Sequence, residues 1–322
     1  MAEEGSGTPA RLILQPDDSV ITSAQAAIAF GANVIAREQP GAIAGEEEPI
    51  HQLRVGIRRL RASLFLFKNV IHGTHFESFQ RDLPWVSKAA GTVRECDIIE
   101  SLLRSRASKL DTPLANNLTL LYDALGERRR TAHTNLTAIF ASNRYRNLMT
   151  RLGAPRLKNA GTLGTLGPST AQMLLPMVRA VKRAGTGVDE HSPPEVLHRL
   201  RVRIKRLRYA LEMLDKLGGK ACKKTINQLE KLQTAAGEFT DVVAAIAWLR
   251  TFADSPAAPA SALLAAGAMI QSLNRRQQKL AARFLKNWHR FERKDLLSAV
   301  LDETRDSAQQ APQPESAGVP AS

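Results

Sequence analysis

The chain contains few cysteines and few aromatic residues. Cys96 and Cys222 are the only cysteines among its 322 residues, and neither has a partner at a metal-ligand spacing. Two isolated thiols argue against a disulfide framework and are typical of proteins in a reducing cytoplasm. Aromatic residues make up only 5% of the sequence, and no strand-like alternation of apolar and polar residues occurs. This composition favours helices over sheets.

The sequence also lacks the features of secreted and membrane proteins. Its first residues, Met1-Ala2-Glu3-Glu4-Gly5, are acidic, and no apolar h-region follows them. No apolar run approaches the roughly 20 residues that a membrane span needs. We therefore expect a cytoplasmic protein without a membrane partner.

Acidic residues are outnumbered by basic ones. The chain has 45 lysines and arginines against 31 aspartates and glutamates, which gives a formal net charge of +14. An excess of this size predicts a polyanionic partner, such as nucleic acid, an anionic membrane or a phosphate polymer. With 43% apolar residues, the chain is also long enough to fold into two domains or two fused halves.

One basic stretch occurs twice. His51–Arg61 and His198–Arg208 both read His-x-Leu-Arg-Val-x-Ile-Arg/Lys-Arg-Leu-Arg, at an offset of 147 positions and without a gap. On a helix with about 100° per residue, the apolar residues of each copy share one face. The predicted inward faces are Leu53, Ile57, Leu60 and Leu64 in the first copy, and Leu200, Ile204, Leu207 and Leu211 in the second.

The other face of each copy is a ladder of basic residues. The first ladder comprises His51, Arg54, Arg58 and Arg61, and the second comprises His198, Arg201, Lys205 and Arg208. Residues three and four apart are neighbours on a helix, so these like charges repel one another. The ladders therefore predict either acidic partner helices or an anionic ligand. Their basic neighbours Arg59 and Arg206 are further candidate ligand residues.

Capping residues and helix breakers divide the chain into two similar halves. They predict four long helices in each half, over residues 19–38, 46–71, 76–104 and 112–141 and over residues 169–183, 195–217, 221–252 and 260–288. Either Asp18 or Ser19 can cap the first helix. The predicted fold is all-α, with a first half at 19–152, a linker at 153–168, a second half at 169–302, and disordered ends at 1–18 and 303–322.

The doubled motif resembles the CHAD family, the conserved-histidine α-helical domain. The family places a Gly-x-x-x-Asp element on the helix after the motif, and the sequence has such elements at 91–95 and 237–241. The first copy departs from the pattern because Glu95 stands where aspartate is usual, although Asp97 fits a further acidic position. The resemblance covers residues 20 to 300, nearly the whole chain.

The resemblance implies two pseudo-symmetric four-helix bundles packed around a central basic groove or pore. It also implies binding of inorganic polyphosphate and association with polyphosphate granules; phosphate or sulfate would occupy the same site in a crystal. The binding residues that it implies are the eight ladder residues. Arginine suits this ligand because its planar guanidinium offers a fork of donors to neighbouring phosphate oxygens. Histidines that charge near neutral pH would strengthen binding as the pH falls.

Other basic and acidic residues have supporting roles in this prediction. A second tier of cations would extend the groove: Arg94, Arg130, Arg144, Arg276 and Arg283. Three acids, Glu95, Asp97 and Asp241, would hold and orient the arginines. One histidine per motif does not make a metal site, so we expect neither a metal nor a cofactor. No catalytic arrangement is recognisable, and we do not expect an enzyme.

Two alternatives stay open at this point. The ladders could be solvated surfaces or could pair with Glu95, Asp97, Glu238 and Asp241. The protein could also bind nucleic acid, or polyanions in general. Nucleic acid is disfavoured because the ladders lack interleaved aromatic residues for base stacking and have few Asn or Gln side chains for reading base edges.

Overall fold

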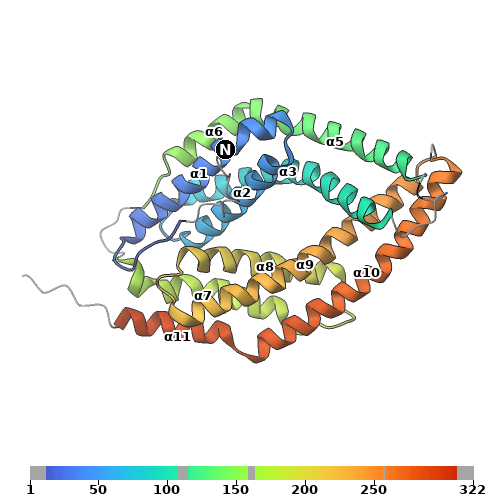
Figure 1. Cartoon of the computed structure of the whole chain (residues 1–322). Helices are drawn as coiled ribbons and strands as arrows, with labels where there is room; N and C mark the ends of the chain where they lie inside the picture. Colours follow the sequence, from blue (N-terminus) through green and yellow to red (C-terminus); the bar gives the residue numbers. More distant parts are fainter. Residues whose placement is uncertain (1–11, 108–114, 116, 159–163, 257, 310–322) are drawn as a thin grey trace, which may run out of the picture.

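The protein is helical throughout the part of the chain that the structure describes. The computed structural model describes residues 12–107, 115, 117–158, 164–256 and 258–309. Its helices are α1 (Val20–Ala44), α2 (Glu47–Leu66), α3 (Gly73–Ala107), α5 (Leu118–Ala141), α6 (Asn143–Gly153), α7 (Leu166–Gly185), α8 (Pro194–Met213), α9 (Gly219–Ala253), α10 (Ala260–Arg293) and α11 (Leu296–Gln309) (Figure 1). The all-α fold class is confirmed.

The helices form two groups that meet at the motif helices. Figure 1 shows α1, α2, α3, α5 and α6 on one side of the molecule and α7 to α11 on the other. The motif helices α2 and α8 are in direct contact, as are α3 and α9. At the α2–α8 contact, the Ser63 hydroxyl donates to the Met213 sulfur at 3.1 Å. The pseudo-symmetry of the two halves stays a prediction.

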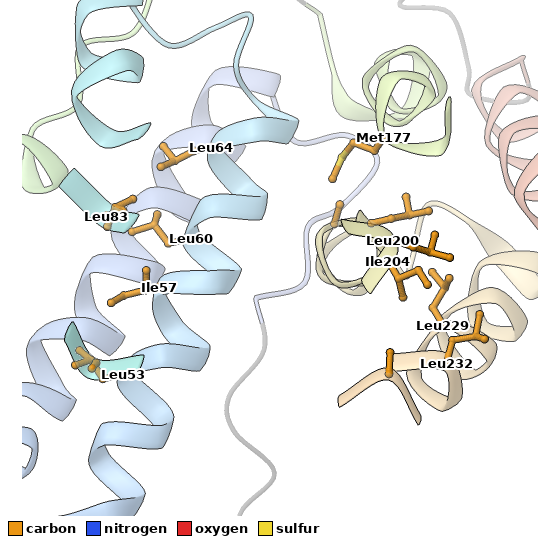
Figure 2. Close-up of a cluster of buried hydrophobic side chains, with 14 of the residues drawn as sticks. Leu53, Ile57, Leu60, Leu64, Leu83, Met177, Leu200, Ile204, Leu229 and Leu232 are labelled. Atoms are coloured by element: carbon orange, nitrogen blue, oxygen red, sulfur yellow. The ribbon is translucent and has the colours of Figure 1, made fainter. Parts of the chain in front are cut away.

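Each motif helix buries the apolar face expected of it. Leu53, Ile57, Leu60 and Leu64 are completely buried, and Leu200, Ile204, Leu207 and Leu211 are at most 1% exposed. Figure 2 shows the residues of α2 packed in one half and those of α8 packed in the other, beside Leu229 and Leu232 of α9. At ~25 cal/mol per Å² of buried apolar surface, these faces hold both helices in place independently of their charges.

Several helix boundaries differ from the prediction. α1 continues through Pro40 to Ala44, because the last turn is held from α5 by hydrogen bonds to Ala42 and Gly45. α2 ends at Leu66 rather than near residue 71. α8 ends at Met213 rather than at 217, and α10 continues to Arg293 rather than ending at 288. The first helix is capped by Ser19, whose hydroxyl accepts from the amides of Ile21 and Thr22.

The predicted disordered ends are wrong where the structure describes them. Leu14 is buried, and its amide donates to the carbonyl of Met213 at 3.0 Å, so residues 12–18 pack against the end of α8. At the other end, α11 extends to Gln309 and packs on α7 and α9, beyond the expected boundary at 302. Residues 1–11, 310–322 and the linker segment 159–163 lie outside the described residues.

Helix α1 is relevant to the expectation that the protein has no membrane partner. By length and composition, α1 is the single helix in the described ranges that is long and apolar enough to cross a bilayer. Core helices of soluble proteins pass the same test, and α1 buries Ala24, Ile28 and Ile35 in the core. Its composition is therefore weak evidence for a membrane span.

Candidate functional site

The two motif helices present their basic faces to one cavity. This cavity, which we call the ladder cavity, has a volume of about 690 Å³ and is open to solvent. Its basic lining consists of Arg54, Arg58 and Arg61 from α2 and Arg201, Lys205 and Arg206 from α8. Ser87 of α3 and Tyr209 of α8 add hydroxyl groups. Residues that are 147 positions apart in sequence thus converge on one site.

The basic side chains of the ladder cavity form no close ion pair, although the carboxyl of Asp241 is near enough to act on Arg54, Arg201 and Lys205. Among the residues that the structure describes, no carboxylate lies within 4.0 Å of any of its six basic side chains. Four of these side chains also bury an Nε–H group that has no acceptor: Arg54, Arg58, Arg61 and Arg201. Buried donors normally have a partner, so these four groups have unused capacity to donate to a ligand.

Burial and mutual repulsion shift the pKa values in the cavity. Burial, followed by Arg58, Arg94 and Arg201, lowers the pKa of Arg54 to about 10. Burial, followed by Arg201 and Arg58, lowers the pKa of Lys205 to about 6. At neutral pH the Lys205 amine is therefore mostly uncharged in the free protein, and an anion in the cavity would restore its charge.

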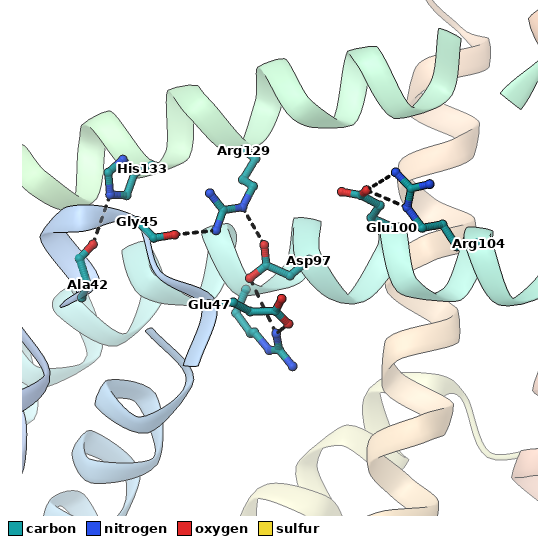
Figure 3. A network of polar contacts seen from close by, with 9 residues as sticks. Ala42, Gly45, Glu47, Asp97, Glu100, Arg104, Arg129 and His133 are labelled. Atoms are coloured by element: carbon teal, nitrogen blue, oxygen red, sulfur yellow. Dashed lines mark hydrogen bonds and ion pairs between the residues drawn. The ribbon is translucent and has the colours of Figure 1, made fainter. Parts of the chain in front are cut away.

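The supporting acids occupy two different settings. Asp97 accepts from Arg129 of α5 at 2.6 Å, and Figure 3 shows this contact with Glu47 close by. Glu47 forms an ion pair with Arg94. Glu95 accepts from Arg128 of α5 at 2.7 Å. These two acids fasten α3 to its neighbours and do not neutralise the ladder. Asp241 instead faces the cavity cations, which lower its pKa, but burial has the larger effect and the net shift is upward.

The glycine of each Gly-acid element lies against a ladder arginine. A Cβ atom on Gly91 would lie 4.0 Å from the guanidinium of Arg54, and one on Gly237 would lie 3.9 Å from that of Arg201. The two glycines thus leave room for the guanidinium groups to rest on α3 and α9. This contact gives the Gly-acid elements a physical role that spacing alone did not reveal.

Besides the two motif histidines, two predicted ligand residues do not line the cavity. Arg208 is buried and paired, with its Nη1 2.8 Å from Glu212 and its Nε donating to Gln233 at 2.9 Å. The reason is local: the second motif has Glu212 four residues after Arg208, whereas the first has Phe65 at the equivalent place. Arg59 lies 3.7 Å from the same Glu212 and lines a separate, mostly apolar pocket between α1, α2 and α8.

The two motif histidines lie at the edge of the site. His51 is close to Arg54, Arg58 and Arg94, and burial followed by Arg94 lowers its pKa. His198 is exposed and lines a neighbouring surface pocket beside Phe239. Burial followed by Arg201 lowers its pKa as well. Both histidines are therefore neutral at pH 7 unless an anion binds next to them.

The second-tier arginines are dispersed. Arg94 influences Arg54 but is itself paired with Glu47, and Arg130 is exposed and paired with Glu127. Arg144 is bound to the buried Asp82 at 2.8 Å and stacks on Trp85, so its role is structural. Arg276 and Arg283 share Glu238 in a second cleft, away from the ladder cavity.

Sequence reasoning missed Tyr209. It occupies the position equivalent to Ala62 and hydrogen-bonds with Arg58 and Arg208, which lower its pKa against the opposing effect of burial. Its spacing was a usable signal, because Arg201, Lys205 and Tyr209 follow one another at four-residue intervals on one face of α8.

No candidate metal centre accompanies this site. Among the described residues, no group of three or more His, Cys, Asp or Glu side chains is arranged to hold an ion.

The fold and the site define a class: an all-helical protein in which two similar cationic helices share one basic cavity. The sequence matches the CHAD domain family over residues 26–250, and the chain belongs to that family. It is similar to the crystal structure of the CHAD domain from the plant Ricinus communis, with 27% identity, a TM-score of 0.72 and coverage of 88% of this chain and 97% of that one. PptA from Streptomyces chartreusis has the same fold, with 18% identity, a TM-score of 0.66 and coverage of 83% and 98%. No curated protein matches the chain.

Proposed function

We propose that the protein binds inorganic polyphosphate in the ladder cavity, without chemical turnover, and thereby associates with polyphosphate granules in the cytoplasm. One observation carries this proposal. Six basic side chains from two helices converge on one cavity and, among the described residues, have no carboxylate within 4.0 Å. A flexible polyanion can supply many phosphate oxygens to such a cluster at once, with release of its counterions.

The lining of the cavity favours a phosphate chain over nucleic acid. Tyr209 is the aromatic residue that lines the cavity, and Arg59 and Arg208 lie over its ring at 5.8 and 4.8 Å. Tyr209 is also only 4% exposed, so its ring offers little surface for stacking on a base, which is the usual way to hold single strands. The cavity lining also includes no Asn or Gln side chain that could read a base edge.

Binding without turnover fits the same lining. The cavity is lined by cations, hydroxyls and small apolar groups, and the nearby carboxyl of Asp241 has no second acid beside it in the cavity lining. Cations alone are sufficient to bind a polyanion.

We expect long-chain polyphosphate to outcompete double-stranded DNA and RNA at matched phosphate concentration and physiological salt. The measurement is displacement of a fluorescent polyphosphate tracer, with the salt dependence recorded in parallel. We expect both nucleic acids to compete at least about tenfold more weakly, because they offer a more rigid or base-bearing backbone to a narrow cavity. Equal competition by DNA would instead indicate a general polyanion binder.

Replacing Gly91 or Gly237 by leucine should weaken polyphosphate binding by about tenfold, since a charge-assisted hydrogen bond contributes roughly 1.5–3 kcal/mol. The longer side chain would occupy the place where the guanidinium of Arg54 or Arg201 rests. Alanine is the matched control, because its Cβ fits at an ordinary contact distance and alanine favours the helix. Titration of both variants with polyphosphate is the measurement, and equal affinity for Leu and Ala variants would contradict the proposed role of the glycines.

A further inference from the structure

A second basic cleft lies outside the ladder cavity. It is formed where α3, α9 and α10 meet and has a volume of about 1480 Å³, open to solvent. Its charged lining consists of Arg106 from α3, Glu238 from α9, and Arg275, Arg276, Lys279 and Arg283 from α10. Among the described residues, five cations therefore face a single carboxylate, and we call this site the α10 cleft.

The single carboxylate does not neutralise the α10 cleft. Glu238 is shared between Arg276 at 3.5 Å and Arg283 at 3.9 Å. Arg276 also buries an Nε–H group without an acceptor. Burial, followed by the charge of Arg276, lowers the pKa of Arg106, which shows that cations from α3 and α10 lie close enough to repel each other.

The α10 cleft shares two helices with the ladder cavity. On α9, Gly237 supports Arg201 of the ladder cavity, while the next residue, Glu238, faces the α10 cleft. These two residues are consecutive on α9, so the side of this helix that contacts Arg201 adjoins the side that faces the α10 cleft. On α3, the nineteen residues from Ser87 of the ladder cavity to Arg106 of the α10 cleft span about 28 Å. A single extended polyanion can therefore reach both sites.

The lining of the α10 cleft indicates which ligand it fits. Besides the charged residues it contains Gln271, Ser272, Ala268 and Leu280, and no aromatic residue. It offers no stacking surface for a base and no deep apolar pocket for a peptide side chain. Closely spaced anionic groups without such parts are what a phosphate chain provides.

We propose that the α10 cleft is a second subsite that binds the continuation of a polyphosphate chain held in the ladder cavity. This inference rests on the proposed function and adds a chain-length preference to it. Short chains occupy the ladder cavity alone, whereas long chains occupy both sites and gain affinity through the linked second contact.

The test compares tripolyphosphate with polyphosphates of increasing length on full-length protein at fixed ionic strength. The double variant Arg275→Ala/Lys279→Ala should bind tripolyphosphate like the wild type and long chains about tenfold more weakly, with a shallower salt dependence. Glu238→Gln should bind long chains several-fold more tightly and leave tripolyphosphate unchanged, a gain that misfolding cannot produce. The matched control is Lys286→Ala/Arg290→Ala, which removes two exposed cations from the same helix outside the cleft and should change neither affinity.

Three outcomes would overturn the inference. In the first, the Arg275→Ala/Lys279→Ala variant binds like the control at every chain length. In the second, this variant loses affinity for tripolyphosphate by the same factor as for long chains. In the third, Glu238→Gln leaves the affinity for long chains unchanged. Failure of the proposed function looks different, because the wild-type protein itself would then not bind long-chain polyphosphate.

Discussion

Replacing Arg54, Arg58, Arg201 and Lys205 together by glutamate should weaken polyphosphate binding by at least about 1000-fold, which is about 4 kcal/mol. These four residues line the ladder cavity from both motif helices, and the change lowers the formal net charge from +14 to +6. Each substitution removes a donor to phosphate and adds a repelling charge. A ligand held by many charge-assisted contacts cannot compensate for this at physiological salt. Titration with labelled polyphosphate is the measurement.

The same variant should keep its helical fold. Both motif helices are held by completely or almost completely buried leucine and isoleucine faces, which the four substitutions do not touch. The four glutamates repel one another, but Arg61, Arg206 and Arg94 remain close by and offset this repulsion. Far-ultraviolet circular dichroism should therefore match that of the wild type.

A control variant with the same net charge distinguishes the loss of affinity caused by the cavity residues from the loss caused by a lower net charge. Arg179, Arg183, Lys223 and Lys224 are exposed on α7 and α9 and do not line the ladder cavity, and reversing them also gives a formal charge of +6. We expect this control to lose less than about tenfold in affinity, mainly through weaker long-range attraction. Equal losses in both variants, or tight binding by the cavity variant, would place the binding site elsewhere.

The convergence of the two ladders was expected from the family resemblance, and the sequence pattern itself explains which residues take part. The helical period assigns each residue to one face of its helix. The inward leucine and isoleucine faces are accordingly where the sequence placed them. Periodicity gives only the angular position of a side chain, however, and does not say which charge will lie opposite it.

The errors arise where the two copies diverge. Glu212 replaces Phe65, which neutralises Arg208 and removes it from the site, and Tyr209 replaces Ala62, which adds a hydroxyl. Each of these residues lies four positions after a ladder residue of the second copy. A comparison of the two copies at that spacing would therefore have identified both differences. The α10 cleft could not be predicted from the sequence. It depends on how α3, α9 and α10 cross, and no local sequence pattern determines this crossing.

Lowering the pH from 8 to 6 should strengthen polyphosphate binding by up to about a hundredfold, since one linked proton changes affinity by at most tenfold per pH unit. The sign follows from Lys205, whose pKa in the free protein is lowered to about 6 by burial and by Arg201 and Arg58. Bound phosphate raises that pKa again, so binding takes up a proton at any pH between the free and bound values. Affinity therefore falls as the pH rises above 6. Below pH 6 the amine is already charged, and this dependence levels off.

Lys205→Arg is the discriminating variant, because an arginine in this setting stays charged: even the strongly buried Arg54 has a pKa of about 10. Its affinity should vary less than that of the wild type between pH 6.5 and 8, and the dependence that remains should come from His51 and His198, whose pKa values are lowered in the free protein. Calorimetry in buffers of different ionisation enthalpy should show uptake of about one proton by the wild type at pH 7.5 and less by the variant. The ligand should be long-chain polyphosphate, so that protonation of its terminal phosphates contributes little to the measured proton uptake. A wild-type affinity that is flat from pH 6 to 8 would mean that the Lys205 amine is already charged in the free cavity, and that the acids around it neutralise the ladder after all.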